Sequence, residues 1–134
     1  MAGVFDKMHL KDQTEILVLN APASFEPELA RLRGVTVYRN AAEVTNVAFS
    51  LAFVTTQAEL DAASRTVAKK AAKGDAMVWF AYPKGSSKTH RSEINRDTGW
   101  EVLAKAGFEG MAMVAIDEDW AAKRLRRKEF IKRQ

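Results

Sequence analysis

Residues 47–59 read VAFSLAFVTTQAE, and this stretch decides the predicted fold. The run from Val47 to Val54 is almost continuously apolar, which is typical of a central strand covered on both faces. Thr56 and Glu59 then have the spacing of a capping box, in which the threonine side chain accepts from the amide of the glutamate and the glutamate reaches back. A buried strand that leads directly into a helix is the repeating unit of an α/β sheet.

Similar strand and helix signals recur on both sides of this stretch. The predicted strands cover residues 15–19, 35–39, 47–54, 76–81 and 111–116, and the predicted helices cover residues 24–33, 57–72 and 98–106. Ser24 is the expected N-cap of the first helix. Residues 121–129 fit either a helix or the second strand of a hairpin. We therefore expect one α/β domain over residues 1–134, a layered fold with a mostly parallel sheet of about five or six strands, about three helices and a possible antiparallel C-terminal edge hairpin.

The composition excludes several kinds of site and argues against others. The chain has no cysteine, which excludes disulfides, thiolate nucleophiles and cysteine-ligated metals. Its two histidines, His9 and His90, argue against a histidine-rich metal centre. Charges near the N-terminus stand where a signal peptide needs an apolar run, and no stretch approaches the roughly 20 apolar residues of a membrane-spanning helix. A cytoplasmic protein without a membrane segment is the expectation.

The most polar loops follow the predicted strands. Because the carboxyl ends of parallel strands meet at one edge of a sheet, these loops are expected to gather there, where α/β sheets bind ligands. The segments concerned are Asn20–Pro22, Thr55–Thr56, Tyr82–Lys88 and Asp117–Trp120. The sequence thus locates a candidate site without naming its ligand or a cofactor.

The loop from Pro83 to Arg96 contains the groups that an anion needs. Lysine and arginine charges, serine hydroxyls and free backbone amides bind phosphates and carboxylates. The P-loop pattern is absent. The main hypothesis is a binding or regulatory domain for a small anionic or phosphate-bearing ligand; a solvated surface loop is the alternative. The predicted ligand-binding residues are Asn20, Lys84, Ser86, Ser87, Lys88, Arg91 and Arg96.

An enzyme at the same edge is a second hypothesis. Asp117 and Asp119 form a possible acid–base pair, with Asn20 orienting a substrate. An acidic tight turn is the structural alternative for the two aspartates, because Asp is favoured in turns.

A third hypothesis concerns nucleic acid. Residues 123–134 carry an excess of six positive charges, whereas the rest of the chain carries about two negative charges net. Clustered cations of this kind neutralise phosphates. A strand edge protected by charge explains the same pattern and is favoured over nucleic-acid binding. The candidate contact residues are Lys123, Arg124, Arg126 and Arg127.

A family resemblance covers most of the chain and is densest from Trp79 to Trp120. The pattern VWFAYPKGSSK…INRDTGWEVLAKAGFEG…VAIDEDW…R…R…EFIK resembles a bacterial family of small α/β proteins carried as a domain of unknown function. This resemblance implies a bacterial cytosolic protein with a single α/β domain. By analogy the predicted strand order is similar to a Rossmann-like or methyltransferase-like sheet. The chain departs from that pattern after its first strand, where no GxGxxG occurs, and at the end of its second strand, where Asn40 replaces an acidic residue.

Overall fold

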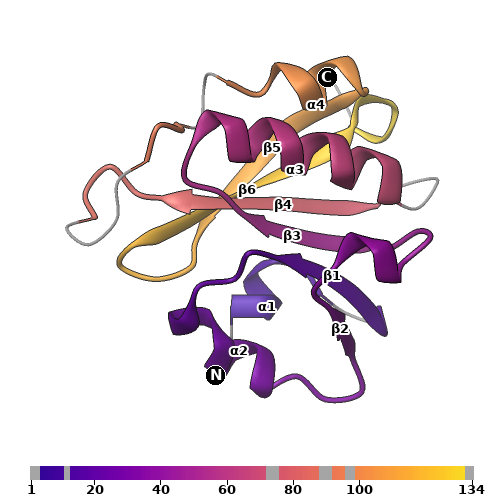
Figure 1. The fold of residues 1–134 in the computed structure, drawn as a ribbon, viewed down its shortest axis with the longest axis vertical. Coiled ribbons are helices and arrows are strands. Elements are labelled where there is room, and N and C mark those ends of the chain that lie inside the picture. Colours follow the sequence, from indigo (N-terminus) through magenta and orange to yellow (C-terminus); the bar gives the residue numbers. More distant parts are fainter. Residues whose placement is uncertain (1–3, 11–12, 72–75, 88–91, 96–98, 132–134) are drawn as a thin grey trace.

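The computed structural model describes residues 4–10, 13–71, 76–87, 92–95 and 99–131. A six-stranded sheet of order β2-β1-β3-β4-β6-β5 runs through the described part (Figure 1). Its strands are β1 (Glu15–Leu19), β2 (Thr36–Tyr38), β3 (Phe49–Phe53), β4 (Met77–Pro83), β5 (Phe108–Ala115) and β6 (Trp120–Arg127). The first four strands are parallel, and β6 is antiparallel to both of its neighbours. The predicted α/β class with a mostly parallel sheet is confirmed.

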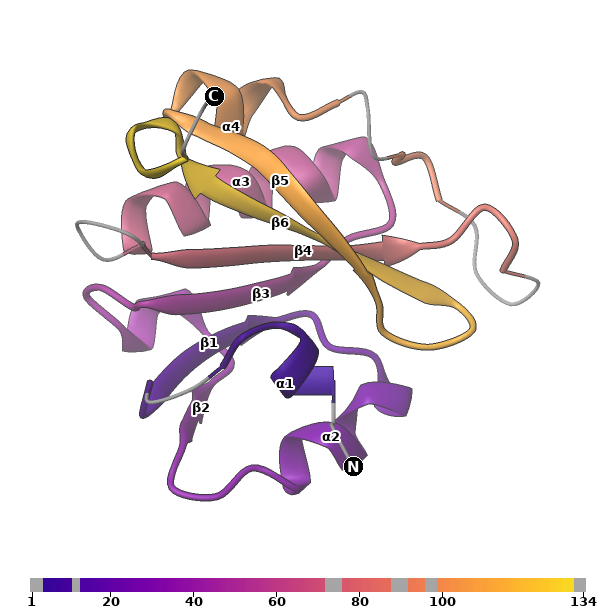
Figure 2. The same ribbon diagram turned by 180° about the vertical axis from the view of Figure 1, so that it is seen from behind.

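Helices cover both faces of the central strands (Figures 1 and 2). One face packs against α1 (Val4–Lys7), the 3-10 turn η1 (Ala23–Phe25) and α2 (Glu26–Ala30). The other face packs against α3 (Gln57–Lys70) and α4 (Glu101–Lys105). Every residue of β3 is buried, which is the physical reason for its unbroken apolar sequence.

The C-terminal segment forms the antiparallel hairpin and not the helix. Strand β5 begins at Phe108, earlier than the sequence predicts, and β6 pairs with both β5 and β4. Ala122 and Leu125 are buried on opposite faces of β6, whereas the cations between them are half-buried. Strand β6 lies between β4 and β5, where side chains on both of its faces are covered. The small and apolar residues Ala122 and Leu125 suit these two faces, so the segment forms a strand and not a helix.

The helices agree with the sequence in part. The capping box at α3 is confirmed: the Thr56 side chain accepts from Glu59 N at 3.1 Å, and Glu59 Oε1 accepts from Thr56 N at 3.2 Å. The helix predicted for residues 24–33 is shorter, and the prediction of Ser24 as its N-cap is wrong because Ser24 lies within η1 and α2 begins after Phe25. The helix α1 was not predicted from the sequence. The predicted cap of the helix near residue 98 falls on Thr98, outside the described residues.

A further η2 turn (Ala41–Glu43) lies between β2 and β3, and η3 (Lys128–Phe130) follows β6. Within the described ranges, every helix is too short or too polar to cross a bilayer. The connection from β2 to β3 contains the turn η2 where an α/β sheet usually has a full helix.

We predict that Thr56→Ala lowers the free energy of unfolding by about 1 kcal/mol, because an N-cap hydroxyl satisfies a helix amide that has no other partner. Thr66 provides the matched control, since it lies inside the same helix and its hydroxyl donates to Ala62 O at 3.1 Å. Thr66→Ala removes the same atoms but should be neutral or slightly stabilising, because alanine is the better helix former. Urea denaturation of both variants checks this; equal losses would contradict the capping role.

Candidate functional site

The structure brings the predicted loops together at the edge where the parallel strands end (Figure 1). Lys84 N donates to Asp119 O at 2.7 Å, and Ser87 Oγ donates to the Asp119 carboxylate at 2.8 Å. Glu93 N donates to Thr55 O at 3.0 Å. The loop after β4 is therefore fastened both to the turn before β6 and to the end of β3.

The two aspartates of this edge serve the turn that they belong to. Asp117 Oδ1 accepts from Asp119 N at 2.8 Å and from Trp120 N at 2.9 Å, which closes the turn between β5 and β6. The Asp119 carboxylate accepts from Ser87. Both carboxylates thus have structural partners, as the turn interpretation expects.

Three of the residues predicted to bind an anion, Lys84, Ser86 and Ser87, lie in the described part of the loop after β4. Lys84 and Ser87 are half-buried and Ser86 is exposed, and the Asp119 carboxylate accepts from the Ser87 hydroxyl. A carboxylate so close opposes a second anion. Lys88, Arg91 and Arg96 lie outside the described residues, and Asn20 lines a different pocket.

The basic residues of β6 alternate between the two faces of the sheet. Lys123 lies over the Trp100 ring at 4.3 Å, and Arg127 lies over the Phe108 ring at 5.0 Å. Side chains alternate between the two faces along a strand. Arg124 and Arg126 therefore lie on the opposite face of β6 from Lys123 and Arg127. The four cations proposed as a nucleic-acid contact therefore do not form one patch.

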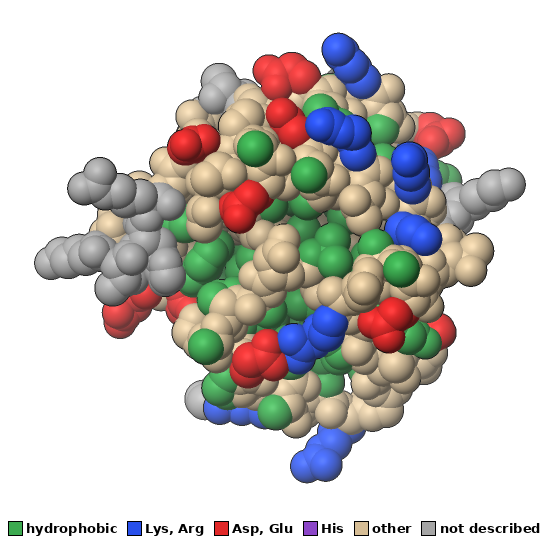
Figure 3. All heavy atoms as spheres, viewed as in Figure 1, with side chains coloured by type: hydrophobic (Ala, Val, Ile, Leu, Met, Phe, Trp, Pro, Cys, Tyr) green, Lys and Arg blue, Asp and Glu red, His purple; other side chains and the backbone are tan. Residues whose placement is uncertain are grey.

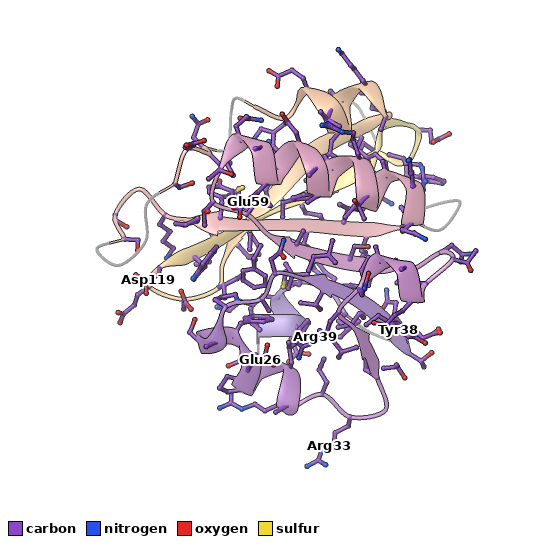
Figure 4. The ribbon with its side chains drawn as sticks, viewed as in Figure 1. Glu26, Arg33, Tyr38, Arg39, Glu59 and Asp119 are labelled. Atoms are coloured by element: carbon purple, nitrogen blue, oxygen red, sulfur yellow. The ribbon has the colours of Figure 1, made fainter. Side chains whose placement is uncertain are left out.

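A pocket of about 430 Å³ lies beside the carboxyl ends of β1 and β2, and we call it the β1–β2 edge pocket. It opens on the face of the sheet that carries α3, where a hollow with hydrophobic side chains in its floor is visible (Figure 3). Figure 4 labels Glu59 on one side of this hollow, with Arg39 and Glu26 on the other. The lining residues are Leu19, Asn20, Arg39, Asn40, Ala41, Glu59, Ala62, Ala63 and Thr66.

Asn20 occupies the turn immediately after β1. Its φ of 60° lies in the left-handed region, which glycine adopts freely and asparagine tolerates better than most residues. The sequence contains no glycine in this turn, yet the backbone adopts the conformation that a glycine would permit. The exposed side chain of Asn20 borders the pocket.

Glu59 is the carboxylate that lines this pocket. Its Oε1 accepts from the Thr55 hydroxyl and the Thr55 amide, both at 2.7 Å, and from the Thr56 amide. The hydrogen bond from the Thr55 hydroxyl, followed by the bond from its amide, lowers the pKa of this carboxyl below its ordinary value. Among the described residues no cation forms an ion pair with Glu59.

Arg39 and Glu26 form an ion pair at the rim of the pocket. The guanidinium donates to both carboxylate oxygens, at 2.7 and 2.8 Å. The hydrogen bonds of this pair lower the pKa of Glu26 and raise the pKa of Arg39. Asn40 is also engaged, since its Oδ1 accepts from Ala42 N at 3.0 Å and caps η2. Of the two charged residues that line the pocket, Arg39 is paired with Glu26, and Glu59 carries the negative charge.

Of the nine lining residues, the sequence predicts only Asn20 as a site residue. Arg39, Asn40 and Glu59 are polar lining residues that it does not predict. Arg39 and Asn40 directly follow the second strand, and Glu59 was interpreted as a capping residue alone. The position of Arg39 and Asn40 at a strand end is the signal that could have identified them. Glu59 both caps α3 and lines the pocket, and its capping-box spacing in the sequence indicates only the first of these roles.

Comparison with known proteins supports the fold. No protein-family model and no curated protein matches the chain. Among solved structures, a SAM-dependent methyltransferase from Aquifex aeolicus is similar over 92% of this chain and 87% of that chain, with a TM-score of 0.59 and 16% identity. Fibrillarin from Aeropyrum pernix, with natively bound S-adenosyl-L-methionine, covers 86% of this chain and 67% of its own, at 15% identity and a TM-score of 0.55.

A third similar structure is the magnesium protoporphyrin IX methyltransferase from Synechocystis with bound SAH. It covers 92% of this chain and 78% of its own, with 10% identity and a TM-score of 0.57. This structural similarity establishes a Rossmann-like α/β fold, and identities this low establish nothing about activity.

We predict opposite effects for two substitutions at Asn20. Asn20→Gly should leave the free energy of unfolding unchanged or raise it slightly, because glycine adopts the left-handed φ without strain. Asn20→Ala should lower the same quantity by about 1 kcal/mol, because a Cβ without a polar side chain is penalised in that region. Thermal unfolding of both variants checks the conformation of this turn; equal stability of the two would argue that the turn is not left-handed.

We also predict a pH dependence for the Glu59 cap. Because the pKa of Glu59 is lower in the folded chain than its ordinary value of 4.5, its ionised form stabilises the fold above that pH. This contribution is lost as the pH falls through the lower, folded-state pKa. The stability difference between wild type and Glu59→Gln, measured by denaturation from pH 6 to pH 3, should therefore shrink in acid. A difference that stays constant over this range would contradict the assignment.

Proposed function

We propose that this chain is a methyltransferase-like enzyme that binds a small cationic nucleoside of the S-adenosylmethionine type in the β1–β2 edge pocket. The observation that carries the proposal is the position of the pocket. In this sheet β1 is the switch point, because β2 lies on one side of it and β3 on the other. Open α/β sheets bind ligands outside the strand ends at such a point. Two of the similar structures are methyltransferases, and the fibrillarin structure holds natively bound S-adenosyl-L-methionine, which supports this ligand class.

The size and polar groups of the pocket suit a nucleoside. A volume of about 430 Å³ lies within the roughly 300 to 1,000 Å³ of small-molecule sites. The Glu59 carboxylate can accept from ribose hydroxyls or from an ammonium group, and the Asn20 amide can both donate and accept. Leu19 and Ala63 provide apolar surface for a ring. S-adenosylmethionine, when bound, supplies a methyl group activated by a sulfonium charge.

The electrostatics favour a cation over a phosphate. Helix N-terminal amides are the usual phosphate donors, but at α3 the protein itself uses them. Gln57 N donates to Glu93 Oε1 at 3.0 Å, and Glu59 N donates to the Thr56 hydroxyl. Arg39 is held by Glu26, so its charge is balanced. The ionised Glu59 then gives the pocket a negative potential, which attracts a sulfonium or ammonium group.

The turn after β1 and the end of β2 depart from the glycine-rich dinucleotide pattern. Asn20 takes the place of a glycine while keeping the left-handed backbone. Asn40 stands where an acidic residue holds a ribose, and its oxygen is used to cap η2. In this proposal Glu59, on the neighbouring helix, supplies the carboxylate that β2 lacks.

Calorimetric titration of the full chain with S-adenosylmethionine, S-adenosylhomocysteine and AMP tests the proposal. We expect the two adenosyl ligands to bind and AMP to bind at least tenfold more weakly. Glu59→Gln should weaken S-adenosylmethionine, which is a cation, more than S-adenosylhomocysteine, which has no sulfonium. Gln keeps the capping pattern, so the fold should persist.

Glu43→Gln is the matched control, because Glu43 is exposed on η2 and does not line this pocket. It should leave all three affinities unchanged. Absence of binding by both adenosyl ligands to the folded protein would overturn the proposed function. Equal losses for both ligands in Glu59→Gln would overturn the charge argument alone.

A further inference from the structure

In the described part of the chain, no further strand pairs with the outer edge of β5. The strand has β6 on one side and ends the sheet on the other. Its backbone groups on that outer side alternate in direction and offer hydrogen bonds to a further strand. Figure 2 shows β5 at this margin of the sheet, with the two strands of the C-terminal hairpin in front.

Exposed apolar side chains concentrate at the same edge. The large hydrophobic residues that are exposed in the described part are Met111 and Met113, each 39% exposed, and Phe130, 36% exposed. Met111 and Met113 belong to β5, and Phe130 lies in η3, whose first residue donates to Gly107 O beside the start of β5. Two large apolar side chains exposed two residues apart on an edge strand favour an interaction surface over scattered exposure.

The edge also lacks the charges that protect strand edges. From Gly110 to Ile116 the sequence GMAMVAI has no charged residue, whereas the neighbouring strand β6 is rich in Lys and Arg. Natural proteins guard free edges with lysine, proline or bulges. A bulge between Gly110 and Ala112 interrupts the ladder at Met111, which leaves the segment from Ala112 to Ile116 regular.

We propose that the occupant of this edge is a second copy of the chain, paired antiparallel through the segment from Ala112 to Ile116. The charge pattern favours self-pairing, because any register within the uncharged run places only uncharged side chains opposite one another. A two-fold arrangement also brings the exposed methionines of both copies to one interface. The cations of β6 stay one strand away from the interface on each side.

Charge placed on the edge tests the proposal. Ala115 is exposed and faces Ala121 of β6 in the ladder, so Ala115→Lys adds a guarding charge without disturbing a packed contact. Ala30→Lys, at the exposed end of α2, is the matched control on the other half of the sheet. Sedimentation equilibrium over a range of concentrations should show a wild-type dimer, at least a tenfold weaker dimer for Ala115→Lys, and no change for Ala30→Lys.

The absence of cysteine permits a second measurement. Met113→Cys should give a dimer with a short bismaleimide, and Ala30→Cys should stay monomeric on the same treatment. A wild-type chain that sediments as a monomer up to about 100 µM overturns the proposal. So does a dimer that Ala115→Lys leaves intact, because its interface then lies elsewhere.

Discussion

The structure depends on covering β3 and β4 from both sides. Every residue of β3 is buried, and a parallel strand with two apolar faces is stable only when a layer packs on each. The chain meets this requirement with α1 and α2 on one face and α3 and α4 on the other. The capping box at Thr56 and Glu59 begins α3 directly after β3, so the covering helix starts where the buried strand ends.

The candidate pocket is a consequence of where that cover is incomplete. Between β2 and β3 the chain forms only the short turn η2 as regular structure, which leaves a hollow beside α3 near the ends of β1 and β2. The same carboxylate that caps α3 faces this hollow. One side chain, Glu59, therefore connects the stability of the covering helix with the electrostatics of the pocket.

The sequence predicted which loops meet at the carboxyl ends of the strands. It placed the loops after β3 and β4 and the turn before β6 at one edge, and hydrogen bonds from Lys84 and Glu93 join them. It did not separate the roles within that edge. Asp117 has the same composition signal as a catalytic acid but closes a turn, and the cations of β6 look like one basic cluster in the linear sequence. Strand alternation divides those cations between two faces, which a count of charges cannot show.

The sequence by itself determined the class of fold, the buried strands and the capped helix, because apolar runs and capping spacings are local signals that burial and helix geometry require. Only the tertiary structure decided the conformation of the last strand, the pairing of Arg39 with Glu26 and the pocket beside Asn20. The physical reason is distance along the chain. Residues 121–129 fit a helix or a strand locally, and the choice depended on a place in the sheet between β4 and β5, which distant segments create.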